Sequence, residues 1–167
     1  MSIRTAQDQR DAYRKFSEAA LANPNATLAE MRVNAEMFAE MTAEPSGVSY
    51  EKVDAGGVPA IMVTPAGART DRVLQYVHGG GYVFCSANTH KRMAGHMAKA
   101  IGCRALVLDY RLAPEHPHPA PVNDSVTAYR WLLSQGIRAD HIAISGDSAG
   151  GGLCVATLLK LRDEGVA

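Results

Sequence analysis

The chain has 167 residues, a formal net charge of +0 and 47% hydrophobic side chains, enough to bury the core of one globular domain. The charge balance argues against nucleic acid or an anionic membrane as the main partner, because both attract a basic excess. No run of about 18 apolar residues occurs, so we expect no membrane span. The polar N-terminus lacks the apolar segment of a secretory signal, and we expect a cytoplasmic protein.

The cysteines and histidines do not form a recognisable metal-binding pattern. The three cysteines are far apart, show no CxxC spacing, and are expected to be buried free thiols: Cys85, Cys103 and Cys154. His116 and His118 form a His-x-His pair, but prolines alternate with them and no third ligand is near. We therefore expect neither a metal nor another cofactor.

The first segment, residues 1–45, is expected to contain two helices within residues 5–42. Asn23-Pro24-Asn25 interrupts the helical pattern, and Thr27 followed by Glu30 is typical of a capping box at the start of the second helix. These helices either pack on a core or cover an active site, and their periodicity leaves both possibilities open.

From Val48 onward the pattern changes to strands alternating with helices. Residues 48–54 and 58–64 are expected to pair as a hairpin turning at Gly56-Gly57, followed by a polar loop over residues 65–71. The further expected strands are residues 73–78, 104–109 and 141–145, and the expected helices are residues 88–101, 122–135 and from 149 onward. This alternation predicts an α/β fold over residues 46–167, with a mainly parallel sheet and helices on both faces.

One pentapeptide, Gly146-Asp147-Ser148-Ala149-Gly150, lies between the last expected strand and helix. It matches the Gly-x-Ser-x-Gly nucleophile elbow, a strained turn that lifts a serine hydroxyl out of a sheet. Side chains at the two outer glycines would collide with adjacent elements. Ser148 is therefore the candidate nucleophile, and a glycine-rich turn without catalysis is the alternative.

A second glycine motif, His78-Gly79-Gly80-Gly81, also follows a strand. Glycines allow backbone N–H groups to approach a ligand closely, and the oxyanion formed in ester hydrolysis needs such donors. No Lys-Ser or Lys-Thr ending follows, so phosphate binding is a poor interpretation. We favour a structural role for His78 over one as general base.

A third motif, Tyr110-Arg111-Leu112-Ala113-Pro114-Glu115, completes a series whose order resembles the hormone-sensitive lipase family of serine esterases, which have the α/β-hydrolase fold. The resemblance extends from about residue 45 to the end of the chain. It implies that Gly80, Gly81 and Ala149 form the oxyanion hole, with His78, Gly79, Gly146, Asp147 and Gly150 supporting the two loops. It also implies that residues 1–45 belong to a helical cap over the acyl pocket.

The catalytic acid and histidine expected after the nucleophile are not found in this chain. The α/β-hydrolase order is Ser, then Asp or Glu, then His, and no histidine follows Ser148. Asp147 and Glu115 are considered as acids and set aside, because one adjoins the nucleophile and the other lies in a proline-rich loop. We therefore expect the C-terminal portion of the fold, with the triad Asp and His, to lie outside this chain, possibly as another chain.

The predicted function is hydrolysis of short-chain acyl esters through a serine acyl-enzyme, with the small ester as the partner molecule. A catalytically inactive ligand-binding protein of the same fold is the main alternative, and a peptidase or acyltransferase is another. The chain alone is expected to be inactive and poorly behaved as a monomer, although a homo-oligomer is possible. The strand at residues 141–145 would become an exposed edge, and three helical side chains would be uncovered: Val155, Leu158 and Leu159.

Overall fold

A computed structural model describes residues 5–166 and begins with a helical N-terminal segment. This segment contains α1 (Ala6–Ala22), α2 (Leu28–Ala35) and the 3-10 helix η1 (Glu36–Met41). The predicted capping box at Thr27 and Glu30 is confirmed, and Thr5 and Asp8 form a second one at the start of α1. Residues 1–4, where the signal-free N-terminus was expected to begin, lie outside the described residues.

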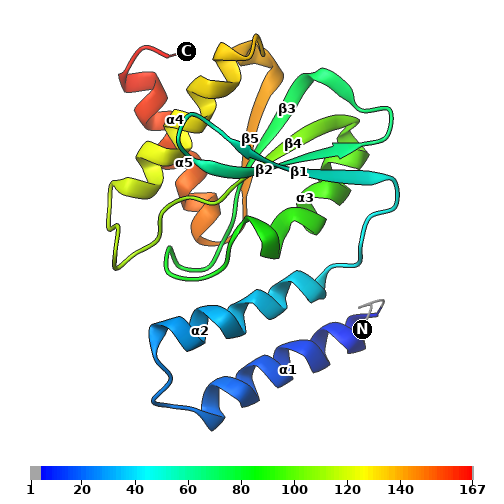
Figure 1. Cartoon of the computed structure of the whole chain (residues 1–167), viewed down its shortest axis with the longest axis vertical. Coiled ribbons are helices and arrows are strands. Elements are labelled where there is room, and N and C mark those ends of the chain that lie inside the picture. The colour runs from blue at the N-terminus through cyan, green and yellow to red at the C-terminus, as the bar shows by residue number, and fades with distance from the viewer. Residues whose placement is uncertain (1–4, 167) are drawn as a thin grey trace.

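A five-stranded sheet in the order β1-β2-β4-β3-β5 follows this segment (Figure 1). Its strands are β1 (Val48–Asp54), β2 (Pro59–Pro65), β3 (Arg69–Val77), β4 (Cys103–Leu108) and β5 (Ile142–Gly146). The β3–β4 and β3–β5 pairs are parallel, whereas β2 is antiparallel to both β1 and β4. The sheet is therefore mixed, with only β2 opposing the common strand direction.

The predicted hairpin is confirmed, because Asp54 pairs with Pro59 and both Gly56 and Gly57 have positive φ. The start of β3 differs from the expected polar loop over residues 65–71. This strand already begins at Arg69 and passes through a register shift before Val73. Its first four side chains are exposed, so their polarity gave no apolar pattern from which a strand could be predicted.

Helices cover both faces of the sheet, as expected (Figure 1). One face packs on α3 (Ala87–Ile101) and the other on α4 (Ala120–Ser134) and α5 (Ala149–Asp163). The first core is formed by small α3 side chains such as Ala94 and Ala98 against β2, β3 and β4. The second places Leu132 and Leu153 against the opposite face, and the short 3-10 helix η2 (Ala139–His141) leads into β5.

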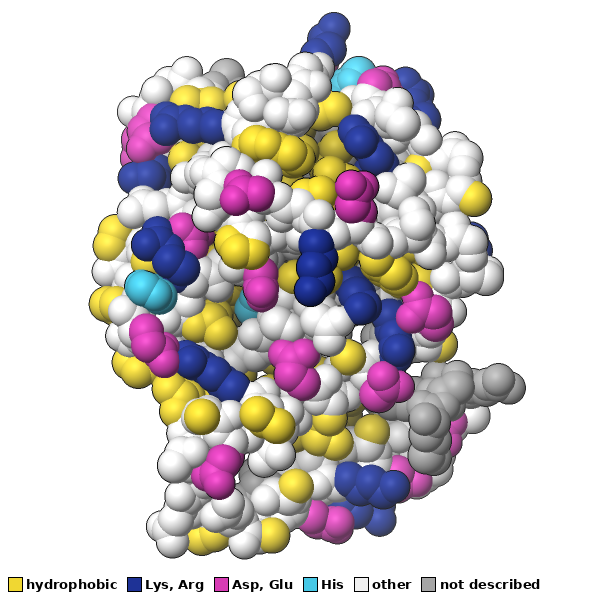
Figure 2. All heavy atoms as spheres, in the orientation of Figure 1, with side chains coloured by type: hydrophobic (Ala, Val, Ile, Leu, Met, Phe, Trp, Pro, Cys, Tyr) yellow, Lys and Arg dark blue, Asp and Glu magenta, His cyan; other side chains and the backbone are white. Residues whose placement is uncertain are grey.

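The β5 edge of the sheet is partly uncovered in the described part of the chain. β5 pairs with β3 alone, which agrees with the expected exposed edge. The three side chains predicted to be uncovered on α5 are exposed by 58%, 53% and 45%: Val155, Leu158 and Leu159. Among the helices of residues 5–166, none combines the length and apolar character needed to cross a bilayer. On the face drawn in Figure 2, acidic and basic side chains are interspersed.

Several polar contacts attach the N-terminal segment to the rest of the molecule. Arg32 of α2 forms a two-pronged ion pair with Glu115 at 2.7 and 2.8 Å and donates to the carbonyl oxygens of Val83 and Ala113. From α3, Arg92 donates to Glu44 at 2.8 Å. These contacts hold α2 and η1 against α3 and the loops that follow β3 and β4, whereas α1 lies outermost (Figure 1).

Candidate active site

The turn between β5 and α5 presents Ser148 to solvent in a strained conformation. Ser148 has φ 49° and ψ −122°, a positive φ that costs a non-glycine residue on the order of 1–2 kcal/mol. Its side chain is exposed, and its hydroxyl makes no hydrogen bond with any described residue. Since α5 begins at the next residue, the first amides of that helix have no intrahelical partner.

Close backbone approach explains the two outer glycines of this turn. A Cβ atom at either Gly146 or Gly150 would lie far inside van der Waals distance of the Val77 carbonyl oxygen at the end of β3. Backbone atoms of a central strand cannot move aside cheaply, so only glycine fits at these positions. The expected steric reason for both glycines is therefore confirmed.

The glycine loop follows β3 and lies beside this turn. Gly80 has φ 113°, and a Cβ atom there would collide with the carbonyl of Phe84. Gly81 has φ 62°, yet a Cβ atom there would meet no described atom within 4 Å. Within residues 5–166, the N–H groups of Gly80 and Gly81 donate to no acceptor. Two free backbone donors therefore lie in a loop whose shape depends on glycine.

His78 is completely buried at the end of β3 and is part of the loop's support. Its Nδ1 lies 2.7 Å from the Gly79 carbonyl oxygen, and its ring stacks on Tyr110 at 4.3 Å between centroids. The Tyr110 hydroxyl donates to the His78 carbonyl oxygen at 2.6 Å. Burial lowers the pKa of His78 to about 4, so the ring is neutral at pH 7. This environment suits a structural histidine.

Asp147 connects the serine turn to the glycine loop. One of its carboxylate oxygens, Oδ1, accepts hydrogen bonds from the Tyr76 hydroxyl at 2.9 Å and the Gly79 amide at 3.0 Å, and Nε2 of His90 lies 3.4 Å away. Partial burial alone would raise the pKa of Asp147. His90 opposes that effect most strongly and, with Tyr76 and the Gly79 amide, lowers the pKa to about 2.

Two further residues of this site, Tyr76 and His90, were not predicted from the sequence. Tyr76 is on β3 and appeared only as an apolar strand residue. His90 is on α3, far from Asp147 in sequence, and only the folded structure brings the two together. One sequence feature pointed to it: His90 precedes the buried Ala94 and Ala98 at intervals of four, which places it on the inward face of the helix.

A pocket of about 450 Å³ surrounds Ser148 and Asp147. Its other walls come from the glycine loop, from α3 and from the N-terminal segment, and they are formed by Gln9, Tyr13, Phe38, Met41, Thr42, Gly80, Cys85, Thr89, His90 and Met93. The N-terminal segment therefore lines the cavity that contains the candidate nucleophile.

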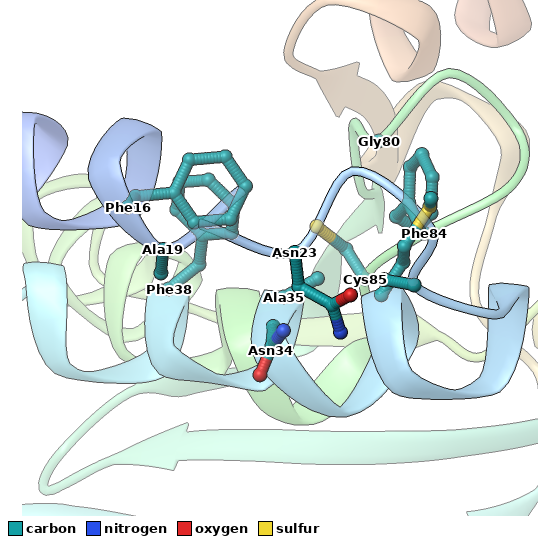
Figure 3. A pocket seen from close by; sticks show the side chains of 11 residues that line it. Phe16, Ala19, Asn23, Asn34, Ala35, Phe38, Gly80, Phe84 and Cys85 are labelled. Atoms are coloured by element: carbon teal, nitrogen blue, oxygen red, sulfur yellow. The ribbon is translucent and has the colours of Figure 1, made fainter. Parts of the chain in front are cut away.

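A second pocket of about 390 Å³ adjoins the first and shares Phe38, Gly80 and Cys85 with it. Figure 3 shows the rings of Phe16 and Phe38 at one end of this pocket and Phe84 with Cys85 at the other. Its full lining comprises Phe16, Ala19, Asn23, Ala26, Met31, Asn34, Ala35, Phe38, Gly80, Phe84 and Cys85. The walls are largely apolar, which suits a hydrocarbon chain.

The remaining candidates from the sequence have other environments. All three cysteines are free, as expected, although only Cys103 is fully buried. In the part of the chain that the structure describes, no group of three His, Cys, Asp or Glu side chains is arranged to hold a metal ion. Glu115 is exposed and paired with Arg32, which lowers its pKa to about 2. It therefore links the proline-rich loop to the N-terminal segment.

Comparison with known proteins places this geometry in a family. A family model described as the alpha/beta hydrolase fold matches residues 74–167. An acetyl-hydrolase of Streptomyces hygroscopicus is 42% identical over 130 residues, which cover 78% of this chain and 42% of the relative. Carboxylesterase NlhH of Mycobacterium tuberculosis is 35% identical over 147 residues, covering 84% and 45%.

Solved structures agree with this assignment. An esterase from the bacterial hormone-sensitive lipase family is 45% identical, with a TM-score of 0.87, and the match covers 97% of this chain and 54% of that one. The esterase EstE5, soaked with p-nitrophenyl butyrate, is 47% identical with a TM-score of 0.79, covering 84% and 47%. The chain thus spans about half the length of the relatives it matches. It belongs to the hormone-sensitive lipase family of the α/β-hydrolase fold.

Proposed function

We propose that the protein hydrolyses carboxylic esters and that Ser148 is its nucleophile. The observation that carries this proposal is the strained, exposed Ser148 turn, held against a loop with two free backbone donors at Gly80 and Gly81. Relatives named acetyl-hydrolase, carboxylesterase and esterase support the same reaction class. An inactive fold used only for ligand binding would have no need for this strain at a serine.

In the proposed mechanism, Oγ of Ser148 attacks the ester carbonyl carbon and passes its proton to a histidine. The carbonyl oxygen becomes an oxyanion, which accepts hydrogen bonds from the amides of Gly80, Gly81 and Ala149. The positive end of the α5 dipole adds to this stabilisation. The alcohol then leaves with the proton, and water releases the acid from the acyl-enzyme.

We propose that the histidine base and its orienting carboxylate lie outside residues 1–167. The two histidines nearest the site in the described structure are already engaged, His78 by burial and Gly79, and His90 by Thr89 and Asp147. The relatives' roughly twofold greater length leaves room for both groups in the full-length protein. No metal or other cofactor takes part in this mechanism.

The two adjoining pockets support a short acyl ester as substrate, with the reacting carbonyl in the first pocket and the acyl chain in the second. Residues 1–45 would then act as a cap that closes over the chain, since Phe16 and Phe38 form part of its apolar wall. The second pocket has a volume of about 390 Å³, which accommodates the methylene groups of a short acyl chain.

Replacing Ser148 tests the proposed function. In the longest natural reading frame that contains this chain, Ser148→Ala should reduce release of p-nitrophenol from p-nitrophenyl butyrate to below about 1% of wild type. Ser134→Ala is the matched control, because that hydroxyl is exposed on α4, donates to the Trp131 carbonyl oxygen and accepts from the neighbouring Gln135 amide. Activity retained in Ser148→Ala would contradict the assignment. An inactive wild-type protein would favour the ligand-binding alternative.

A further inference from the structure

Three elements converge on one oxygen of Asp147. The Tyr76 hydroxyl comes from β3, the Gly79 amide from the glycine loop and Nε2 of His90 from α3. Asp147 directly precedes Ser148, and Gly79 directly precedes Gly80. A shift of this carboxylate would therefore move the candidate nucleophile and the free amides relative to each other.

His90 is itself held firmly. Its Nδ1 lies 2.7 Å from the Thr89 hydroxyl, whose oxygen also lies 2.7 Å from the Ser86 carbonyl oxygen at the start of α3. The imidazole stacks against Tyr76 and His78 at 6.1 and 5.6 Å between ring centroids. Its side chain is only 12% exposed. These contacts hold the ring with Nε2 at 3.4 Å from Oδ1 of Asp147.

We propose that His90 is a positioning residue for the reaction. It acts through Asp147 to fix the distance between the Ser148 hydroxyl and the donors of the glycine loop. Its kinetic consequence rests on the proposed ester hydrolysis, whereas its structural consequence for the loop does not. Among the described hydrogen bonds and ion pairs, His90 contacts Thr89 and Asp147 and makes none with Ser148.

Two substitutions separate the positioning role from packing. His90→Phe keeps a flat ring against Tyr76 and His78 but removes both nitrogens, whereas His90→Gln provides an amide that can donate to Asp147. In the longest natural form of the protein, His90→Phe should lower kcat for p-nitrophenyl butyrate about 10- to 100-fold, with KM changed less than about threefold. His90→Gln should recover most of kcat. Wild-type kcat in His90→Phe would overturn the proposal.

A double-mutant cycle tests whether the effect passes through Asp147. If it does, adding His90→Phe to Asp147→Ala should lower kcat by less than about twofold further, because the shared contact is already lost. If the two losses multiply, His90 acts independently of Asp147 and the proposal is wrong. Thermal unfolding of each variant identifies losses of kcat that arise from unfolding.

Hydrogen exchange provides a test that does not depend on esterase activity. With Gly79 less firmly bonded, its amide should exchange at least about fivefold faster in His90→Phe than in wild type, as followed by NMR. His96→Phe is the matched control, because His96 lies on the same helix and contacts the Ala43 carbonyl oxygen instead. Unchanged exchange at Gly79 would overturn the proposal. An inactive wild-type protein with faster exchange in His90→Phe would refute the proposed function and retain the positioning role.

Discussion

The Ser148 turn and the glycine loop are held in place by a different kind of contact from the N-terminal helices. Around Ser148 the backbone of β3 approaches Gly146 and Gly150 so closely that no side chain fits. The N-terminal segment is instead attached by side-chain contacts, among them Arg32 with Glu115 and Arg92 with Glu44. Within the segment, the outer helix α1 packs on η1 through the rings of Phe16 and Phe38, with 4.8 Å between centroids.

In the proposed mechanism, this difference would separate the reaction geometry from the selection of the substrate. A loop fixed by backbone contacts keeps donors and nucleophile in register, which the proposed chemistry requires. A helical segment held by side chains can change its lining residues without disturbing that register. We therefore expect substitutions in the loops to affect stability and turnover, and substitutions in the N-terminal segment to affect the choice of substrate.

The largest expected effect comes from a pair of neighbouring glycines. Gly150→Ala should lower the free energy of unfolding by about 3 kcal/mol or more, because its Cβ atom would collide with the carbonyls of Val77 and His78. Gly151→Ala should change it by no more than about 1 kcal/mol, since the nearest atom to its Cβ is 3.6 Å away and alanine favours a helix. Urea unfolding measures both variants. Equal losses would mean that steric fit does not explain the motif.

A second pair of glycine substitutions distinguishes a loss of catalysis from the effect of backbone strain. Gly81→Val should reduce kcat about a hundredfold, as expected when one oxyanion donor is lost. Gly67→Val is its control, because Gly67 also has a positive φ, 73°, with no described atom within 4 Å of a Cβ atom there. Both variants should lose similar stability, but Gly67→Val should keep wild-type kcat. Normal turnover in a folded Gly81→Val protein would count against the oxyanion assignment.

The smallest expected effect tests the N-terminal segment. Ala19→Trp should fill the apolar pocket and lower the preference for octanoyl over acetyl p-nitrophenyl esters about tenfold, because each methylene left unburied costs ~0.8 kcal/mol. Ala22→Trp, an exposed position outside that lining, is the control. The preference is measured as the ratio of kcat/KM for the octanoyl ester to kcat/KM for the acetyl ester in each variant. An unchanged preference in Ala19→Trp would mean that the acyl chain binds elsewhere.

The parts of the fold that could be predicted from sequence are those fixed by local steric demands. Gly56-Gly57, Gly102 and the Ser148 turn each need a backbone conformation or approach that few sequences allow, so their positions identified the hairpin, the end of α3 and the nucleophile turn. The alternation of strands and helices then indicated the layered architecture. The order of the three sequence motifs then indicated the family.

The rest depends on contacts between residues distant in sequence. The pairing of His90 with Asp147 and that of Arg32 with Glu115 leave no local pattern, because each partner alone resembles an ordinary surface or helix residue. The start of β3 at Arg69 was not predicted for a related reason. Its first residues are polar and exposed, and it pairs with β4 through backbone atoms, which leave no pattern in the sequence. The pockets could not be predicted, because their shape depends on how α1, α2 and the glycine loop are placed relative to one another.

The most direct test of the central claim is to identify the residue that reacts covalently. The full-length protein should be treated with phenylmethylsulfonyl fluoride, digested and examined by mass spectrometry. We predict one sulfonyl adduct on the peptide that contains Ser148, formed in step with the loss of p-nitrophenyl butyrate turnover. An adduct on a different residue that tracks the loss of activity, or full inactivation with Ser148 unmodified, would contradict the account.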